Sequence, residues 1–107
     1  MTDEDPMHSA RLGVAMHLIC EVEDTFDLPR LGCVIAPGVP VDFQHSVTRG
    51  ARLAIEEPTG KWMDASVKDM LMIRRNAPFT HIPFSLENDV GTVDVPRGSK
   101  IFLLLEP

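Results

Sequence analysis

The chain has 107 residues, which suits one domain with a single hydrophobic core. Its hydrophobic fraction of 44% excludes wholesale disorder, and its formal charge of −6 disfavours a large phosphate-binding surface for nucleic acid. Two cysteines are too few for a disulfide scaffold, and no apolar run is long enough to cross a membrane. Because the start also lacks the basic and apolar regions of a signal peptide, we expect a soluble cytoplasmic protein without a membrane partner.

The first part of the chain predicts a tail and then a strand. Residues 1–11 are acidic and without periodicity, so we expect a flexible acidic tail before a single domain at residues 12–107. From Val14 to Val22 the sequence alternates, with Cys20 and Val22 on one face and Glu21 and Glu23 on the other. Period two over this length predicts a half-buried strand.

The middle of the chain predicts three more strands. Residues 31–36 form the second, with Cys33 and Ile35 on one face, and residues 37–40 end it because two prolines lack the ladder's N–H donor. Residues 52–57 form a short third strand. Residues 62–75 alternate well enough for a fourth, although the apolar run 70–73 also fits a helix turn.

The last part predicts two further strands around turns. Residues 77–84 contain two prolines, which indicates an edge strand or a loop. Residues 90–95 are a predicted short strand and residues 101–105 a buried closing strand. Many short strands with Gly and Pro turns, and no helical period, predict an all-β sandwich or barrel.

The corner between the first two strands carries a motif. Its residues are Glu23, Asp24, Phe26, Leu28, Gly32, Val34 and Ile35. This pattern, Glu-Asp-x-Phe-x-Leu followed by Gly-x-Val-Ile, resembles the start of domain 2 of elongation factor Tu and related translational GTPases. The resemblance implies a small closed antiparallel Greek-key β-barrel of about six strands.

The resemblance also bears on function. In elongation factor Tu this corner forms part of the pocket for the aminoacylated 3′ end of tRNA. By residue match, Glu23, Asp24, Phe26 and Leu28 are candidate binding residues for an RNA 3′ end, although Leu31 replaces an arginine common in the family. We expect no GTP binding, because Gly60-Lys61 lacks the other residues of a phosphate loop.

Other residue types give no catalytic or metal motif. His8, His17, His45 and His81 are dispersed without metal-ligand spacing, so no metal site and no cofactor are predicted. Cys20 and Cys33 are expected to be reduced, buried thiols. Glu87 to Gly91 fails the calcium-loop template.

The sequence therefore predicts a non-enzymatic β-barrel binding module. Two functions remain open. One is protein–protein interaction, with a partner protein or as a homo-oligomer, through exposed apolar residues such as Phe79 and Phe84. The other is RNA 3′-end binding at Glu23–Leu28, which the acidic charge disfavours.

Overall fold

The computed structural model describes residues 15–71, 80–87 and 90–105, and these form one antiparallel sheet of seven strands. The strands are β1 (Ala15–Glu21), β2 (Asp24–Leu28), β3 (Gly32–Pro40), β4 (Arg52–Glu56), β5 (Trp62–Met70), β6 (His81–Leu86) and β7 (Lys100–Leu105). Their order across the sheet is β1-β7-β4-β5-β6-β3-β2. The predicted all-β class is confirmed, with seven strands in place of about six. No helix among the described residues is long and apolar enough to span a membrane.

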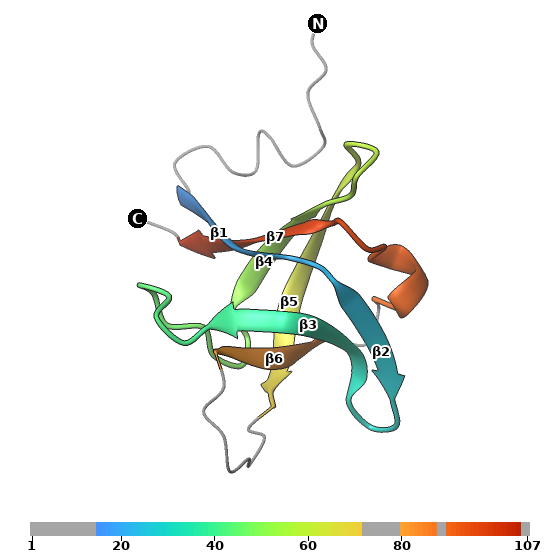
Figure 1. Cartoon of the computed structure of the whole chain (residues 1–107), viewed down its shortest axis with the longest axis horizontal. Helices are drawn as coiled ribbons and strands as arrows, with labels where there is room; N and C mark the ends of the chain where they lie inside the picture. The colour runs from blue at the N-terminus through green and yellow to red at the C-terminus, as the bar shows by residue number, and fades with distance from the viewer. Residues whose placement is uncertain (1–14, 72–79, 88–89, 106–107) are drawn as a thin grey trace, which may run out of the picture.

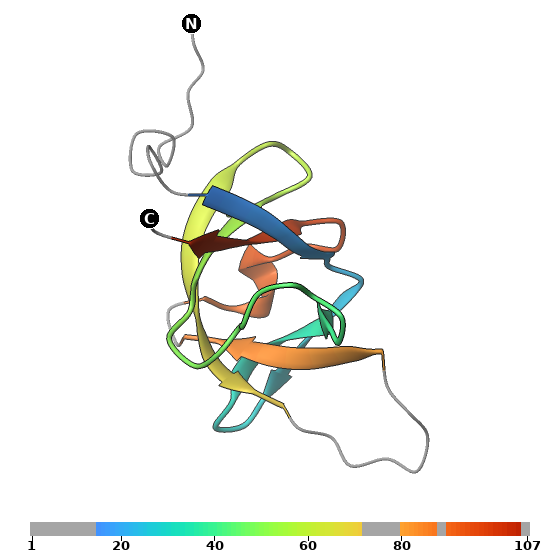
Figure 2. The same ribbon diagram turned by 90° about the vertical axis from the view of Figure 1, so that its left-hand side faces the viewer.

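The sheet curls but its hydrogen-bonded ladder does not close. β1 and β2 stand at the two ends of the strand order and are not paired with each other. Because the sheet bends, β1 nevertheless contacts β3, and the two lie side by side in Figure 1. The view turned by 90° in Figure 2 shows the same curled arrangement. The closed barrel therefore stays a prediction, and the contact of β1 with β3 marks an open seam in the sheet.

The apolar residues of the strands gather inside the curl. Seven of them have no exposed surface at all and belong to one cluster: Ile35, Leu53, Ile55, Val67, Phe84, Leu86 and Ile101. They come from β3, β4, β5, β6 and β7, so this core links the five inner strands of the sheet. Phe84 belongs to this core, and its predicted role as an exposed interaction residue is wrong.

The corner after β1 is built differently from the predicted hairpin. β1 pairs with β7, whereas the partner of β3 is the separate short strand β2. Val22 lies between β1 and β2, where its N–H donates to the carbonyl of Ser99 at 2.7 Å. Val22 is buried and Glu21 and Glu23 are exposed, as predicted, but the expected pairing of the first strand with residues 31–36 is wrong.

β6 lies inside the sheet, between β5 and β3, although the prolines of this region predicted an edge or a loop. In the β3–β6 ladder the paired residues jump from Ile35↔Phe84 to Val39↔Ile82. Pro83 thus stands opposite an irregular segment of β3 that itself contains Pro37. Because neither proline has an N–H to donate, placing both at the break removes no hydrogen bond from the regular part of the ladder. The prolines were expected to end this strand at Ala36. Because they lie at the break in the ladder, β3 instead continues to Pro40.

Two other predicted elements differ in the structure. The expected strand at residues 90–95 is a 3₁₀ helix, η2 (Thr92–Asp94). Its start is fixed locally, because the N–H of Gly91 donates to Oδ2 of Asp94 at 2.9 Å. The fourth predicted strand is confirmed as β5, which ends at Met70. The predicted tail at residues 1–11, Phe79 and the residues from 72 to 75 lie outside the described residues.

Candidate functional site

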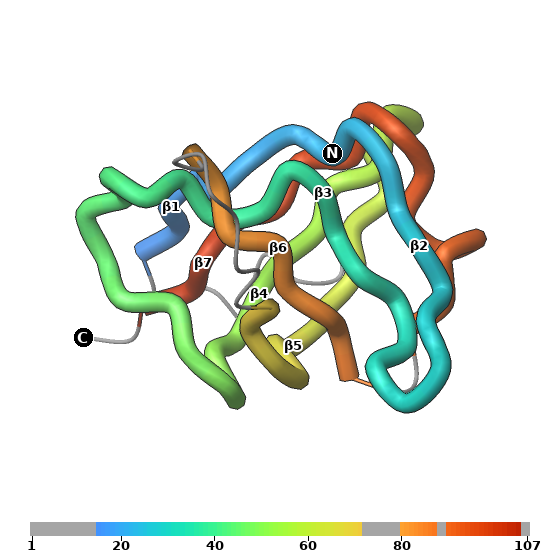
Figure 3. Tube along the Cα trace, turned by 60° about the horizontal axis from the view of Figure 1, so that its bottom comes forward, coloured from blue at the N-terminus to red at the C-terminus, as the bar shows by residue number. Residues whose placement is uncertain are grey.

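The predicted binding residues lie on and beside the end strand β2. β2 pairs only with β3, so its other edge has no strand beside it among the described residues. η2 approaches β2, and the tube in Figure 3 shows β2 along one side of the molecule. We call Glu23, Asp24, Phe26 and Leu28 the β2 surface.

Two apolar side chains of the β2 surface face solvent. Phe26 is 46% exposed and Leu28 is 39% exposed. They share one face of the strand because side chains alternate along it. Phe26 is directly opposite Val34, which is itself buried. A half-exposed phenylalanine on an end strand is available to a partner, whereas a core phenylalanine is not.

The acidic residues of this surface are only partly engaged. The carboxylate of Asp24 accepts a 2.9 Å hydrogen bond from the N–H of Thr25. The backbone carbonyl of Glu23 accepts one from Nε of Arg97 at 3.0 Å. Asp24, Glu23 and Asp27 are all exposed. Of the four residues predicted from the sequence, Asp24, Phe26 and Leu28 lie in β2 and Glu23 directly precedes it. The strand itself carries two negative charges and no positive one.

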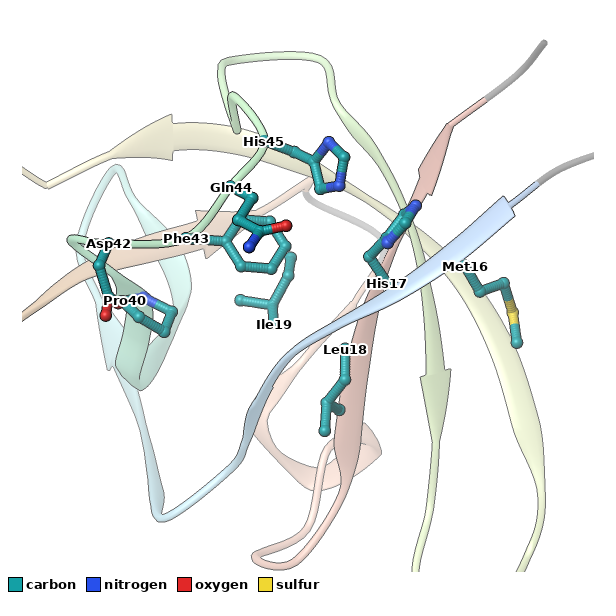
Figure 4. A pocket seen from close by; sticks show the side chains of 9 residues that line it. All are labelled: Met16, His17, Leu18, Ile19, Pro40, Asp42, Phe43, Gln44 and His45. Atoms are coloured by element: carbon teal, nitrogen blue, oxygen red, sulfur yellow. The ribbon is translucent and has the colours of Figure 1, made fainter.

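A second candidate site lies at the open seam. Residues 16–19 of β1 and residues 40 and 42–45 line a hollow of about 420 Å³. We call it the His pocket, because His17 and His45 meet in it with ring centroids 4.2 Å apart and an interplanar angle of 45°. Figure 4 shows both rings pointing toward each other from the two sides.

The shape of β1 creates one wall of the His pocket. The register of β1 with β7 shifts between Leu18 and Cys20, so that Ile19 and Cys20 are both buried. The predicted strict alternation therefore fails at this bulge. Leu18 is 51% exposed and Met16 is 37% exposed, and Figure 4 shows them pointing away from His17 and Ile19.

A turn after β3 creates the other wall. The N–H of Val41 donates to the carbonyl of Thr80 at 2.9 Å, and the N–H of Phe43 donates to the carbonyl of Pro40 at 3.0 Å. These bonds hold the turn that presents His45. The ring of Phe43 packs edge-on against His45 with centroids 5.7 Å apart. No sequence pattern points to this site, because the two histidines are distant in the chain and meet only through the curl of the sheet.

The thiols do not form a third site. Cys20 and Cys33 are free and buried, as predicted. Burial raises the pKa of the Cys20 thiol to about 11, where a hydrogen bond with the backbone of Gly38 opposes the shift. Burial, with the nearby charges of Asp27 and Asp94, raises the pKa of Cys33 to about 11 as well. Both groups are neutral thiols at pH 7, which makes them poor nucleophiles.

No protein-family model, curated protein or solved structure matches this chain. The resemblance to domain 2 of elongation factor Tu therefore stays a prediction from the motif at Glu23 to Ile35.

Proposed function

We propose that this protein is a non-enzymatic protein-binding module that uses the β2 surface. The observation that carries the proposal is the exposure of Phe26 and Leu28 on a strand with a single strand neighbour. An end strand offers unpaired backbone groups to an extended segment, and exposed alternate side chains provide its apolar contacts. A β-barrel like domain 2 of elongation factor Tu remains the proposed architecture, supported by the contact between β1 and β3.

The partner we propose is an extended segment with an apolar residue opposite Phe26 and basic residues beside it. β2 contributes Asp24 and Asp27 without a positive side chain. Opposite charges on facing strands stabilise the pair, and like charges destabilise it. In an antiparallel pairing of two copies centred on Phe26, Asp24 would face Leu28 and Asp27 would face Thr25, so neither carboxylate would gain a cation. A basic partner therefore fits better than a second copy.

The test uses two synthetic peptides of roughly ten residues, the length of a long strand. One alternates lysine with valine and the other alternates glutamate with valine. We expect the lysine peptide to bind in fluorescence anisotropy, and Phe26→Ser to weaken it by about tenfold or more, because exposed aromatic residues are typical anchors of interfaces. Val41→Ser is the matched control, since Val41 is an exposed apolar residue outside the β2 surface.

Two results would contradict the proposal. One is equal binding of the two peptides, and the other is binding that Phe26→Ser does not change. Sedimentation of the free protein as a stable dimer that Phe26→Ser dissociates would assign the β2 surface to a second copy.

RNA 3′-end binding is the second candidate function. The exposed ring of Phe26 favours it, because an exposed aromatic side chain can stack a base. The carboxylates of Glu23 and Asp24 beside that ring oppose it, because they repel phosphate.

A further inference from the structure

We propose that His17 and His45 chelate a divalent late first-row transition-metal ion in the His pocket. This site is separate from the β2 surface and does not depend on the proposed protein-binding function. In the His pocket two imidazoles from different segments of the chain, β1 and the turn after β3, are in contact.

The separation of the rings suits two ligands of one ion. A metal about 2.1 Å from one nitrogen of each ring would place the centroids about 4.5 Å apart at a right angle and about 5.2 Å apart in a tetrahedron. The observed 4.2 Å is nearer the right-angle value. Right-angle pairs of ligands occur in tetragonal and octahedral sites, which nickel and copper adopt.

The walls of the pocket hold both rings in place. His17 lies in the β1–β7 ladder, paired with Leu103, so the backbone of the first ligand is fixed by a strand. His45 is packed against the edge of Phe43. Ligands that are already oriented lose less conformational freedom when the ion binds.

The protein would supply two ligands, and water would supply the others. Among the residues that the structure describes, no three His, Cys, Asp or Glu side chains gather to hold a metal. The hollow of about 420 Å³ leaves room for coordinated water. Two imidazole ligands with water in the remaining positions predict weaker binding than in a closed structural site with four protein ligands.

A metal ion bound to His17 and His45 would link β1 to the turn after β3 across the open seam. No ladder hydrogen bonds link β1 with residues 42–45 in the described structure. An ion that binds only the folded protein raises its thermal midpoint. At ten times the dissociation constant, we expect a rise of about 5 °C for a domain of this size.

The experiment titrates the untagged full chain with Ni²⁺, by calorimetry and by thermal unfolding. We expect one ion per chain, and a loss of affinity of about tenfold or more in both His17→Gln and His45→Gln. His81→Gln and His8→Gln are the matched controls, and neither should change the affinity or the midpoint shift. Thermal unfolding without metal shows whether each variant is folded.

A single variant that fails to fold does not decide the question, because the other histidine provides the same test. As an independent measurement, Cu²⁺ bound to the parent protein should show two nitrogen ligands in its electron paramagnetic resonance spectrum. The proposal is wrong if folded His17→Gln and His45→Gln bind Ni²⁺ as tightly as the parent. It is equally wrong if the parent binds no Ni²⁺, or if the affinity depends on His81 or His8.

Discussion

Gly38 on β3 lies directly against the backbone of Ile82 on β6. A Cβ at Gly38 would stand 2.5 Å from the carbonyl carbon of Ile82 and 2.6 Å from Cα of Pro83, with the carbonyl oxygen of Ile82 nearer still. The φ angle of Gly38 is +101°, which side chains rarely adopt. Only glycine lets β3 and β6 approach each other at the break in their ladder.

We therefore expect Gly38→Ala to lower the free energy of unfolding by about 3 kcal/mol or more, because the backbone of two strands must move apart. Gly60→Ala is the matched control. Gly60 has a similar φ of +94° but nothing within 4 Å of the added Cβ, so it should cost only about 1 kcal/mol. Urea unfolding of the two variants measures the difference. Equal losses would show that β3 and β6 are not in this close contact.

Val22→Asp tests the corner between β1 and β2. Val22 is 1% exposed, so the substitution buries a carboxylate without a partner. We expect a loss of about 3–5 kcal/mol in the free energy of unfolding. Leu18→Asp, at a half-exposed position of β1, should cost much less. A Val22→Asp protein that melts within a degree or two of the parent would contradict the burial of this side chain.

The two thiols predict a dependence of stability on alkaline pH. Folding raises the pKa of Cys20 from 9.0 to about 11, and that of Cys33 likewise. Because an unfolded thiol ionises first, the stabilisation from these neutral thiols is complete below pH 9 and is lost as the pH rises toward 11. Unfolding in urea across this range should show the fall in the parent, and a smaller fall in the double variant Cys20→Ala Cys33→Ala.

Generic RNA is expected not to bind at physiological salt. Phosphate binding needs cations, and each single-strand contact makes affinity fall by about 0.7 log units per log unit of salt. The β2 surface instead carries Glu23 and Asp24. Fluorescence anisotropy with short labelled RNAs, free or blocked at the 3′ end, measures whether the protein binds them at physiological salt. Binding that needs a free 3′ end and is lost in Phe26→Ala would favour RNA as the ligand of the β2 surface.

The sequence predicted the fold class because short apolar segments between Gly and Pro turns, without a helical period, are typical of all-β domains. Cys33 and Ile35, which the sequence places on one face of the second strand, are both buried in β3. Pairing was not predictable in the same way. The expected hairpin partner of β1 was the next strand, whereas its partner β7 lies near the other end of the described chain. Only the three-dimensional curl of the sheet decides whether β1 pairs with the next strand or with β7.

The prolines misled the assignment of β6 for a related reason. Pro83 alone indicates an edge, since it lacks a donor. The structure places it opposite the irregular segment of β3 that contains Pro37, so the missing donors coincide. Whether two prolines meet at the same break depends on how the two strands pair, and neither segment shows this by itself. Likewise His17 and His45 had no local spacing to connect them, while Glu23, Asp24, Phe26 and Leu28 were found together because they are neighbours in sequence.

The pairing of β1 with β7 sets a time order for folding during synthesis. Residues 15–21 emerge from the ribosome well before their partner residues 100–105. Until then β1 has an unpaired edge on each side, with Met16 and Leu18 among its apolar side chains. Contacts between such distant segments slow folding and leave strands open to other chains. Nascent chains stalled before residue 100 should therefore remain sensitive to protease and associate with chaperones, and both should end once residues 100–105 have left the ribosome.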